Sequence, residues 1–153
     1  MKISANGLSI EVDDQGPPGG PVVLLVMGLG MQLVAWPDEL VQALVSRGFR
    51  VIRFDNRDIG LSQHFDHLGT PNLAWAGMRY ALHLKLHPPY SLRDMAADAV
   101  GVLDALGIRS AHVCGASMGG MIAQHLAAGY PERVRSATLV MTTAGARSLP
   151  QPG

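Results

Sequence analysis

Five consecutive apolar residues at positions 22–26 constrain the fold of this chain more than any other feature. An unbroken run of valine and leucine is typical of a strand that is covered on both faces, whereas a half-exposed strand alternates apolar and polar residues. Residues 51–54 and 111–114 are predicted as two further buried strands, and sequence with helical periodicity separates the three. Strands that alternate with helices predict an α/β fold, a mostly parallel sheet with flanking helices and right-handed crossovers.

Apolar residues at helical spacing predict three helices around this sheet. One begins after Trp36-Pro37 and ends at Gly48, and a second begins at Ser91-Leu92-Arg93-Asp94, which has capping-box spacing with Asp in place of the usual Glu. The third follows Ser117. Their predicted apolar faces are Leu40, Val41, Leu44 and Val45 in the first, Met95, Ala99, Val102 and Leu106 in the second, and Met118, Met121, Ile122 and Leu126 in the third.

The remaining segments are a strand at 9–12, a final strand at 137–141 and a proline-flanked, helix-compatible stretch at 73–86. We find no internal repeat and no domain boundary within the sheet.

The composition is that of a single globular domain: 153 residues, 48% hydrophobic and 16% charged. The 12 basic and 12 acidic side chains are scattered, so we expect no nucleic-acid partner. The longest apolar run is too short to cross a bilayer, and no apolar signal core follows Met1, so we expect no membrane segment and a cytoplasmic location. The single Cys114 forbids an internal disulfide, which agrees with a reducing compartment.

The sequence Gly115-Ala116-Ser117-Met118-Gly119 joins a predicted strand to a predicted helix. In that context, the Gly-x-Ser-x-Gly pattern is typical of a nucleophile elbow, which exposes a serine hydroxyl above the edge of a sheet. The two glycines let the helix begin close to the strand. The first N–H groups of a helix have no intrahelical acceptor, so that of Met118 is a candidate oxyanion donor. The alternative is a glycine-rich turn that serves packing alone.

A second glycine-rich turn, Met27-Gly28-Leu29-Gly30, follows the strand at 22–26. In hydrolases with such an elbow, the corresponding loop supplies the other oxyanion N–H. We therefore predict that Leu29 donates it and that Gly28 shapes the turn. The alternative, a dinucleotide site, is disfavoured because the third glycine and the acidic residue of that fingerprint are not in register.

Segments 26–30, 54–62 and 112–120, followed by Tyr130-Pro131-Glu132-Arg133-Val134, resemble the α/β-hydrolase family, specifically its esterase-like, cofactor-free members. The resemblance runs from about residue 7 to residue 145 and implies that Ser117 is the nucleophile, with Leu29 and Met118 as oxyanion-hole donors. It implies a small-molecule ester or related acyl substrate and no cofactor; esterase, lipase-like, peptidase-like and perhydrolase activities all remain open. Met27 stands where many members have histidine, and serine at the elbow argues against the dehalogenase branch.

None of the six histidines lies where a catalytic base is expected. His112 precedes the elbow, and His125 lies about 12 Å along the helix axis from Ser117. The pairs His83/His87 and His64/His67 have spacings that could bind a metal, but no further ligand pattern accompanies them, so no metal site is predicted.

Charged residues also follow the strand at 51–54, on the side of the sheet where α/β proteins bind ligands. We expect these residues, Asp55, Arg57 and Asp58, to hold their loop by ion pairs and hydrogen bonds, in preference to contacting substrate.

The resemblance further implies that residues 1–147 correspond to the N-terminal half of an α/β-hydrolase core and that 148–153 begin a linker toward a cap domain. The catalytic acid and histidine would follow the cap, so the chain alone is expected to be nearly inactive. Two alternatives remain open. The chain could be a non-catalytic half that forms a homo-oligomer or binds a partner through the exposed sheet edge at 137–141, or a separate chain could supply the complementary C-terminal half.

Overall fold

A mixed sheet of six strands, in the order β1-β2-β4-β3-β5-β6, forms the centre of the computed structural model, which describes residues 1–69, 75, 78, 82 and 88–145. The strands β3, β4, β5 and β6 run parallel, while β1 and β2 pair antiparallel at one edge. The predicted α/β fold with a mostly parallel sheet is therefore confirmed. The strands are β1 (Lys2–Ala5), β2 (Leu8–Gln15), β3 (Val22–Val26), β4 (Arg50–Phe54), β5 (Ala111–Ala116) and β6 (Val134–Val140).

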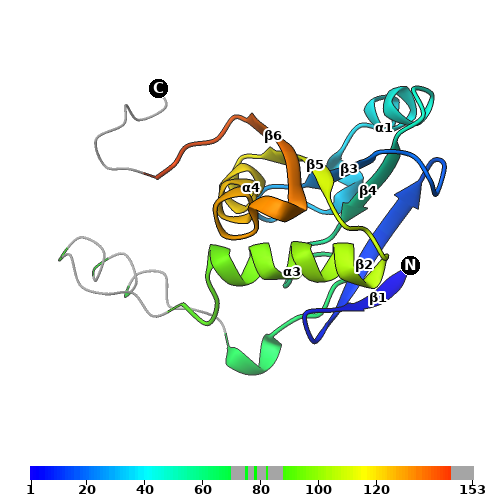
Figure 1. The fold of residues 1–153 in the computed structure, drawn as a ribbon. Coiled ribbons are helices and arrows are strands. Elements are labelled where there is room, and N and C mark those ends of the chain that lie inside the picture. Colours follow the sequence, from blue (N-terminus) through cyan, green and yellow to red (C-terminus); the bar gives the residue numbers. More distant parts are fainter. Residues whose placement is uncertain (70–74, 76–77, 79–81, 83–87, 146–153) are drawn as a thin grey trace.

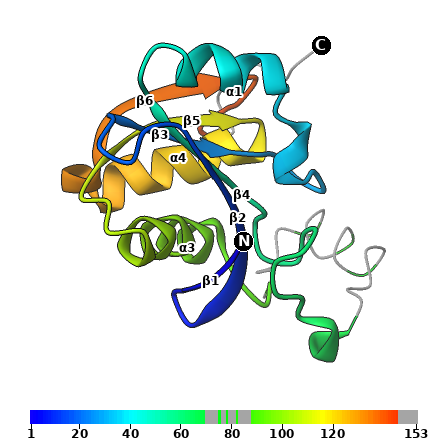
Figure 2. The ribbon, with the colours of Figure 1, turned by 90° about the vertical axis from the view of Figure 1, so that its right-hand side faces the viewer.

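Helices cover both faces of this sheet. The helices α3 (Leu92–Ala105) and α4 (Met118–Gly129) lie on one face, and α1 (Asp38–Val45) lies on the other (Figures 1 and 2). Short 3-10 helices occur at Leu33–Ala35, Asp66–Leu68 and Pro131–Arg133. Within the described ranges, no helix is long and apolar enough to cross a membrane.

The predicted capping box is present at the start of α3. The Ser91 hydroxyl accepts from the Asp94 N–H at 3.4 Å, and the Asp94 carboxylate accepts from the Ser91 N–H at 2.7 Å. Two backbone N–H groups that would otherwise lack partners at the helix start are thus hydrogen-bonded reciprocally. Asp94 takes the capping role that Glu usually has.

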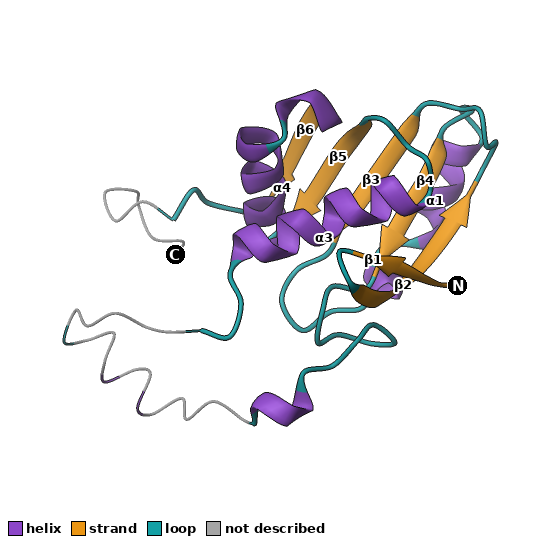
Figure 3. Cartoon of the chain, turned by 60° about the horizontal axis from the view of Figure 1, so that its bottom comes forward, coloured by secondary structure: helices purple, strands orange, loops and turns teal. Residues whose placement is uncertain are grey.

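The strand β3 is buried on both faces, as its apolar run predicts. Val22, Leu24 and Val26 pack into the cluster beneath α3 and α4, while Val23 and Leu25 pack with Trp36 and Val41 on the α1 side. Figure 3 shows α3 crossing one face of the strands, with α1 on the opposite face. The central strand therefore joins two hydrophobic cores.

Several sequence-based details were wrong. Leu40 is 38% exposed, because the short helix α1 packs mainly through Val41. In α4, Met121 is only half-buried, whereas Met118 is half-buried but packs against the core, as predicted. The side of the helix against the sheet is instead lined by Gly119, Gly120, Ile122, Ala123 and Leu126.

The strand boundaries also differ from the predicted ones. The strand β2 extends to Gln15, β6 begins three residues earlier than predicted, and β1 was not predicted at all. The segment 73–86 lies outside the described residues except for positions 75, 78 and 82, and the linker at 148–153 lies outside them entirely.

The strand β6 forms the edge of the sheet beyond β5 and is largely exposed. Leu139 and Val140, at its end, and Met141, directly after it, are exposed apolar residues. The apolar edge predicted at 137–141 is thus present among the described residues, while what covers it stays a prediction.

Candidate active site

Ser117 lies on the turn between β5 and α4. Figure 3 shows α4 following the carboxyl end of β5, one of the parallel strands. The backbone of Ser117 has φ 54° and ψ −120°, a conformation that costs energy for a residue with a Cβ atom. The side chain is exposed and forms no capping hydrogen bond with the helix that it precedes. A serine hydroxyl is therefore presented above the end of the sheet, as the elbow pattern predicts.

The glycines of the elbow are required by close packing. A Cβ atom at Gly115 would overlap the backbone of Gly119, and one at Gly119 would overlap the carbonyl oxygen of Val26. The helix α4 thus begins directly against β5 and β3. This agrees with the predicted role of Gly115 and Gly119 in supporting the turn.

The loop after β3 lies directly beside Ser117. A Cβ atom built on Gly28 would be 3.2 Å from the Ser117 Cβ and 3.7 Å from its Oγ. The next residue is Leu29, and in the described part of the chain neither its N–H nor that of Met118 donates a hydrogen bond. The structure therefore brings together the predicted residues of the two loops, and their roles as oxyanion donors stay predictions.

Asn56 holds this loop and was missed by the sequence analysis. It is 2% exposed, and its Nδ2 donates to the Met27 carbonyl at 2.9 Å, immediately before Gly28. Its Oδ1 is buried and has no partner among the described residues. Its position after β4, within the 54–62 motif, was the signal that could have identified it.

Asp55 ties two loops together. Its carboxylate accepts from the Leu33 N–H at 2.6 Å and from the Leu61 N–H at 2.9 Å, and its carbonyl accepts from the Ser62 hydroxyl at 2.6 Å. Hydrogen bonds to an ionised acceptor are stronger than neutral ones, so this carboxylate fixes the loops after β3 and β4 against each other. The expected loop-holding role of Asp55 is confirmed.

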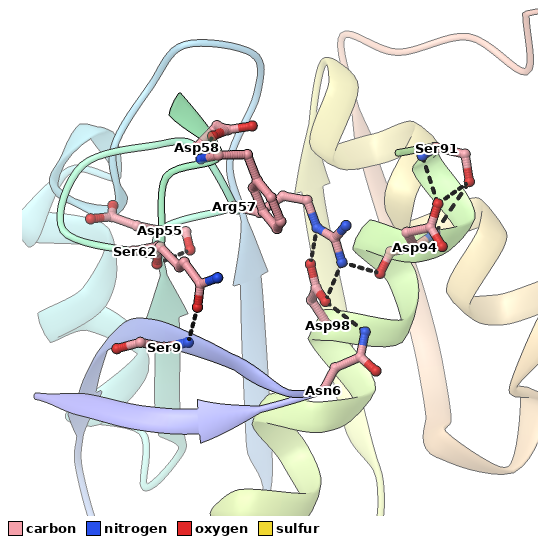
Figure 4. Close-up of polar contacts among 11 residues, drawn as sticks. Asn6, Ser9, Asp55, Arg57, Asp58, Ser62, Ser91, Asp94 and Asp98 are labelled. Atoms are coloured by element: carbon pink, nitrogen blue, oxygen red, sulfur yellow. Dashed lines mark hydrogen bonds and ion pairs between the residues drawn. The ribbon is translucent and has the colours of Figure 1, made fainter. Parts of the chain in front are cut away.

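Arg57 forms a buried ion pair with Asp98 of α3 (Figure 4). Its Nε and Nη2 donate to the two carboxylate oxygens at 2.6 and 2.7 Å, and the Asn6 amide adds a bond of 2.8 Å to the same carboxylate. Although burial opposes the charge, the hydrogen bonds and the charge of Asp98 raise the pKa of Arg57 above its ordinary value. Its guanidinium also lies over the rings of Phe65 and Tyr90, at 5.7 and 5.1 Å from their centres.

Asp58 holds the same loop. Its carboxylate accepts from the Phe65 N–H at 2.6 Å, and its own N–H donates to the Gln63 carbonyl at 3.0 Å. The loop-holding roles expected for Arg57 and Asp58 are thus confirmed as well.

Tyr90 supplies a pH prediction. Burial, followed by a hydrogen bond to Asp58, raises the pKa of Tyr90 from 10.0 to about 12. The folded protein therefore keeps this proton while the unfolded chain loses it, so stability should fall as the pH rises from about 10 to about 12. In a titration followed by tyrosinate absorbance at 295 nm, we expect one phenol to ionise near pH 12. This ionisation step should be absent in Tyr90→Phe. Ionisation of that phenol at its ordinary pKa would contradict the structure.

The hydrogen bonds given for the described histidines lead to partners other than Ser117. His112 is near the opposite end of β5, where its Nδ1 bonds the Ser136 hydroxyl at 2.8 Å, and His64 contacts the Gly60 carbonyl at 3.1 Å. No hydrogen bond joins Ser117 to a histidine within the described ranges, and no group of three or more metal-ligating side chains occurs there. The pair His83/His87 lies outside the described residues.

The family model of the alpha/beta hydrolase fold matches residues 21–152, so the chain belongs to this family. Over 139 residues it is 39% identical to rhodomycin D methylesterase of Streptomyces peucetius. The match covers 91% of this chain and 41% of that protein. Among solved structures, the enol-lactonase of Burkholderia xenovorans LB400 superposes with a TM-score of 0.73 at 29% identity, over 94% of this chain and 47% of that one. A hydrolase of Pseudomonas aeruginosa PA01 superposes with a TM-score of 0.75 at 29% identity, and the match covers 97% of this chain and 48% of that one.

The chain spans less than half of the length of each of the three relatives. Their names all describe hydrolases, and two of them, the methylesterase and the enol-lactonase, are named for ester bonds.

Proposed function

We propose that Ser117 is the nucleophile of a serine hydrolase that acts on carboxylic esters. The hydroxyl attacks the ester carbonyl, the N–H groups of Leu29 and Met118 hold the developing oxyanion, the alcohol leaves, and water then releases the acid from the acyl-enzyme. The observation that carries this proposal is the close contact between the two loops, where a Cβ atom at Gly28 would come within 3.2 Å of the Ser117 Cβ.

The choice of carboxylic esters rests on two arguments. Donors fixed on the backbone beside a serine suit acyl transfer, in which an oxygen becomes negative next to the attacked carbon, and each such donor typically contributes about 10²–10³ in rate. The names of the methylesterase and the enol-lactonase point to the same bond class. The chemistry requires neither metal nor cofactor, and the cytoplasm remains the expected location.

The base and the acid of the triad are proposed to come from sequence outside the described residues. Removing the base of such a triad lowers turnover by about 10⁶, and removing the nucleophile as well then has little further effect. Steady-state turnover of this chain alone is thus a poor test of Ser117. Covalent capture of the serine is the better one.

We expect a fluorophosphonate to label the 153-residue chain once per molecule, slowly alone and faster with added imidazole, which can replace a missing base. Oγ bonds to phosphorus, fluoride leaves, and imidazole takes the hydroxyl proton. Intact mass gives the stoichiometry, and peptide mapping gives the site. Ser117→Ala, which removes the hydroxyl alone, is the matched control. Equal labelling of this variant, or label on another residue, would contradict the proposal.

A second candidate function is association through the edge strand β6. Its last residues, Leu139 and Val140, are exposed and apolar, the next residue, Met141, is 83% exposed, and an unpaired strand edge can accept another strand. A non-catalytic half that pairs with itself, or a complementary C-terminal half supplied by a separate chain, would each cover this edge. Sedimentation of the purified chain distinguishes them, because a dimer supports self-pairing and a monomer excludes it.

A further inference from the structure

Both main-chain polar groups of Ser117 are held by the last residue of β6 and the residues that follow it. The Ser117 N–H donates to the Val140 carbonyl at 2.9 Å, and the Ser117 carbonyl accepts from the Thr142 hydroxyl at 2.7 Å. Residues 140–143, which we call the strap, thus bind the elbow residue on both sides. The strap contains a second strained residue, since Met141 has φ 47°.

The strap is seated closely on α4. A Cβ atom at Gly120 would be 2.6 Å from the Thr142 Cβ and Cγ2, so a glycine is needed there for the threonine to approach. Gln124, one turn further along the helix, donates to the Thr143 carbonyl at 3.1 Å. The contact with Thr142 explains why position 120, which lies outside the Gly-x-Ser-x-Gly pattern, is also a glycine.

The Ser117 carbonyl and the Met118 N–H belong to the same planar peptide group. In a trans peptide these two groups point in opposite directions, so a hydrogen bond that fixes the carbonyl also fixes the direction of the N–H. The Gly120 and Met121 N–H groups, at 2.9 and 3.3 Å from this carbonyl, come from α4 itself and move with it. The Thr142 hydroxyl instead ties the peptide to the end of β6.

We propose that Thr142 is a positioning residue, whose hydroxyl orients the peptide between Ser117 and Met118 and thereby aims the Met118 N–H at the oxyanion. The inference rests on the proposed function of Ser117 and adds a residue on a third loop to it. Thr142 acts through that peptide and contacts no reacting atom.

The test compares three variants in the fluorophosphonate reaction with added imidazole. Thr142→Val keeps the shape and removes the hydroxyl, so the maximal labelling rate should fall about tenfold while the half-saturating concentration of fluorophosphonate stays the same. Thr142→Ser restores the hydroxyl and should label within about twofold of the parent chain. Thr143→Val, one residue further along the strap, is the matched control and should also label within about twofold.

The carbonyl ¹³C shift of Ser117 and the amide shifts of Met118 report on the peptide directly, whether or not the serine reacts. We expect them to change in Thr142→Val and to return in Thr142→Ser. Unchanged shifts in Thr142→Val, unchanged labelling in that variant, or a Thr142→Ser chain as slow as Thr142→Val would each overturn the inference. If the parent chain shows no label on Ser117, the proposed function fails separately, and the shifts still decide whether Thr142 orients the peptide.

Discussion

Replacing Asp98 with alanine is expected to lower the free energy of unfolding by about 3–5 kcal/mol. Asp98 is 2% exposed and accepts both guanidinium bonds of Arg57 as well as the Asn6 amide. The variant would leave the Arg57 charge buried without its partner, which is far more costly than losing a surface ion pair. Urea unfolding followed by circular dichroism measures the change.

The bridge between Arg133 and Asp104 provides the matched control, because Asp104 is 63% exposed. We expect Asp104→Ala to change the free energy of unfolding by about 1 kcal/mol or less. The double variant Arg57→Met with Asp98→Leu should recover much of the loss, because it removes both charges together. Similar losses in Asp98→Ala and Asp104→Ala would show that the Arg57 pair does not hold the loop to α3.

Substituting Gly119 with alanine should destabilise the fold by at least about 2 kcal/mol. The added methyl group would overlap the carbonyl oxygens of Val26 and Met27, which are backbone atoms at the end of β3 and cannot rotate away. The first turn of α4 would have to move from the sheet, and Ser117 would move with it. Thermal and urea unfolding measure the effect.

Gly129, the last residue of the same helix, separates this collision from the general effect of alanine in a helix. A Cβ atom there would meet nothing within 4 Å, so Gly129→Ala should be neutral or stabilising by up to about 1 kcal/mol. If Gly119→Ala were equally well tolerated, α4 would not begin as close to β3 as the structure indicates.

The parts of the fold that could be predicted from sequence are those set by neighbours along the chain. The apolar run of β3, the capping box at Ser91 and Asp94, and the glycines around Ser117 each express a local rule of burial, hydrogen bonding or steric space. The structure confirms each of them.

The missed features depend on contacts between distant segments. Asn56 bonds a carbonyl 29 residues away, and Thr142 bonds one 25 residues away. The 54–62 motif draws attention to Asn56 without revealing its partner, and no local pattern identifies Thr142. The same holds for β1, a four-residue strand with an exposed start, which is defined by pairing with β2. Leu40 shows the limit of helical periodicity: it predicts which side of α1 is apolar, but not how much of that side the sheet buries.

The most direct test of the account is a crystal structure of the chain after reaction with a fluorophosphonate. We predict phosphorus bonded to Ser117 Oγ, with the phosphonyl oxygen about 2.7–3.1 Å from the N atoms of both Leu29 and Met118. This one measurement examines the nucleophile and both oxyanion donors together. An adduct on another side chain, or a phosphonyl oxygen directed to solvent and away from both N–H groups, would contradict it.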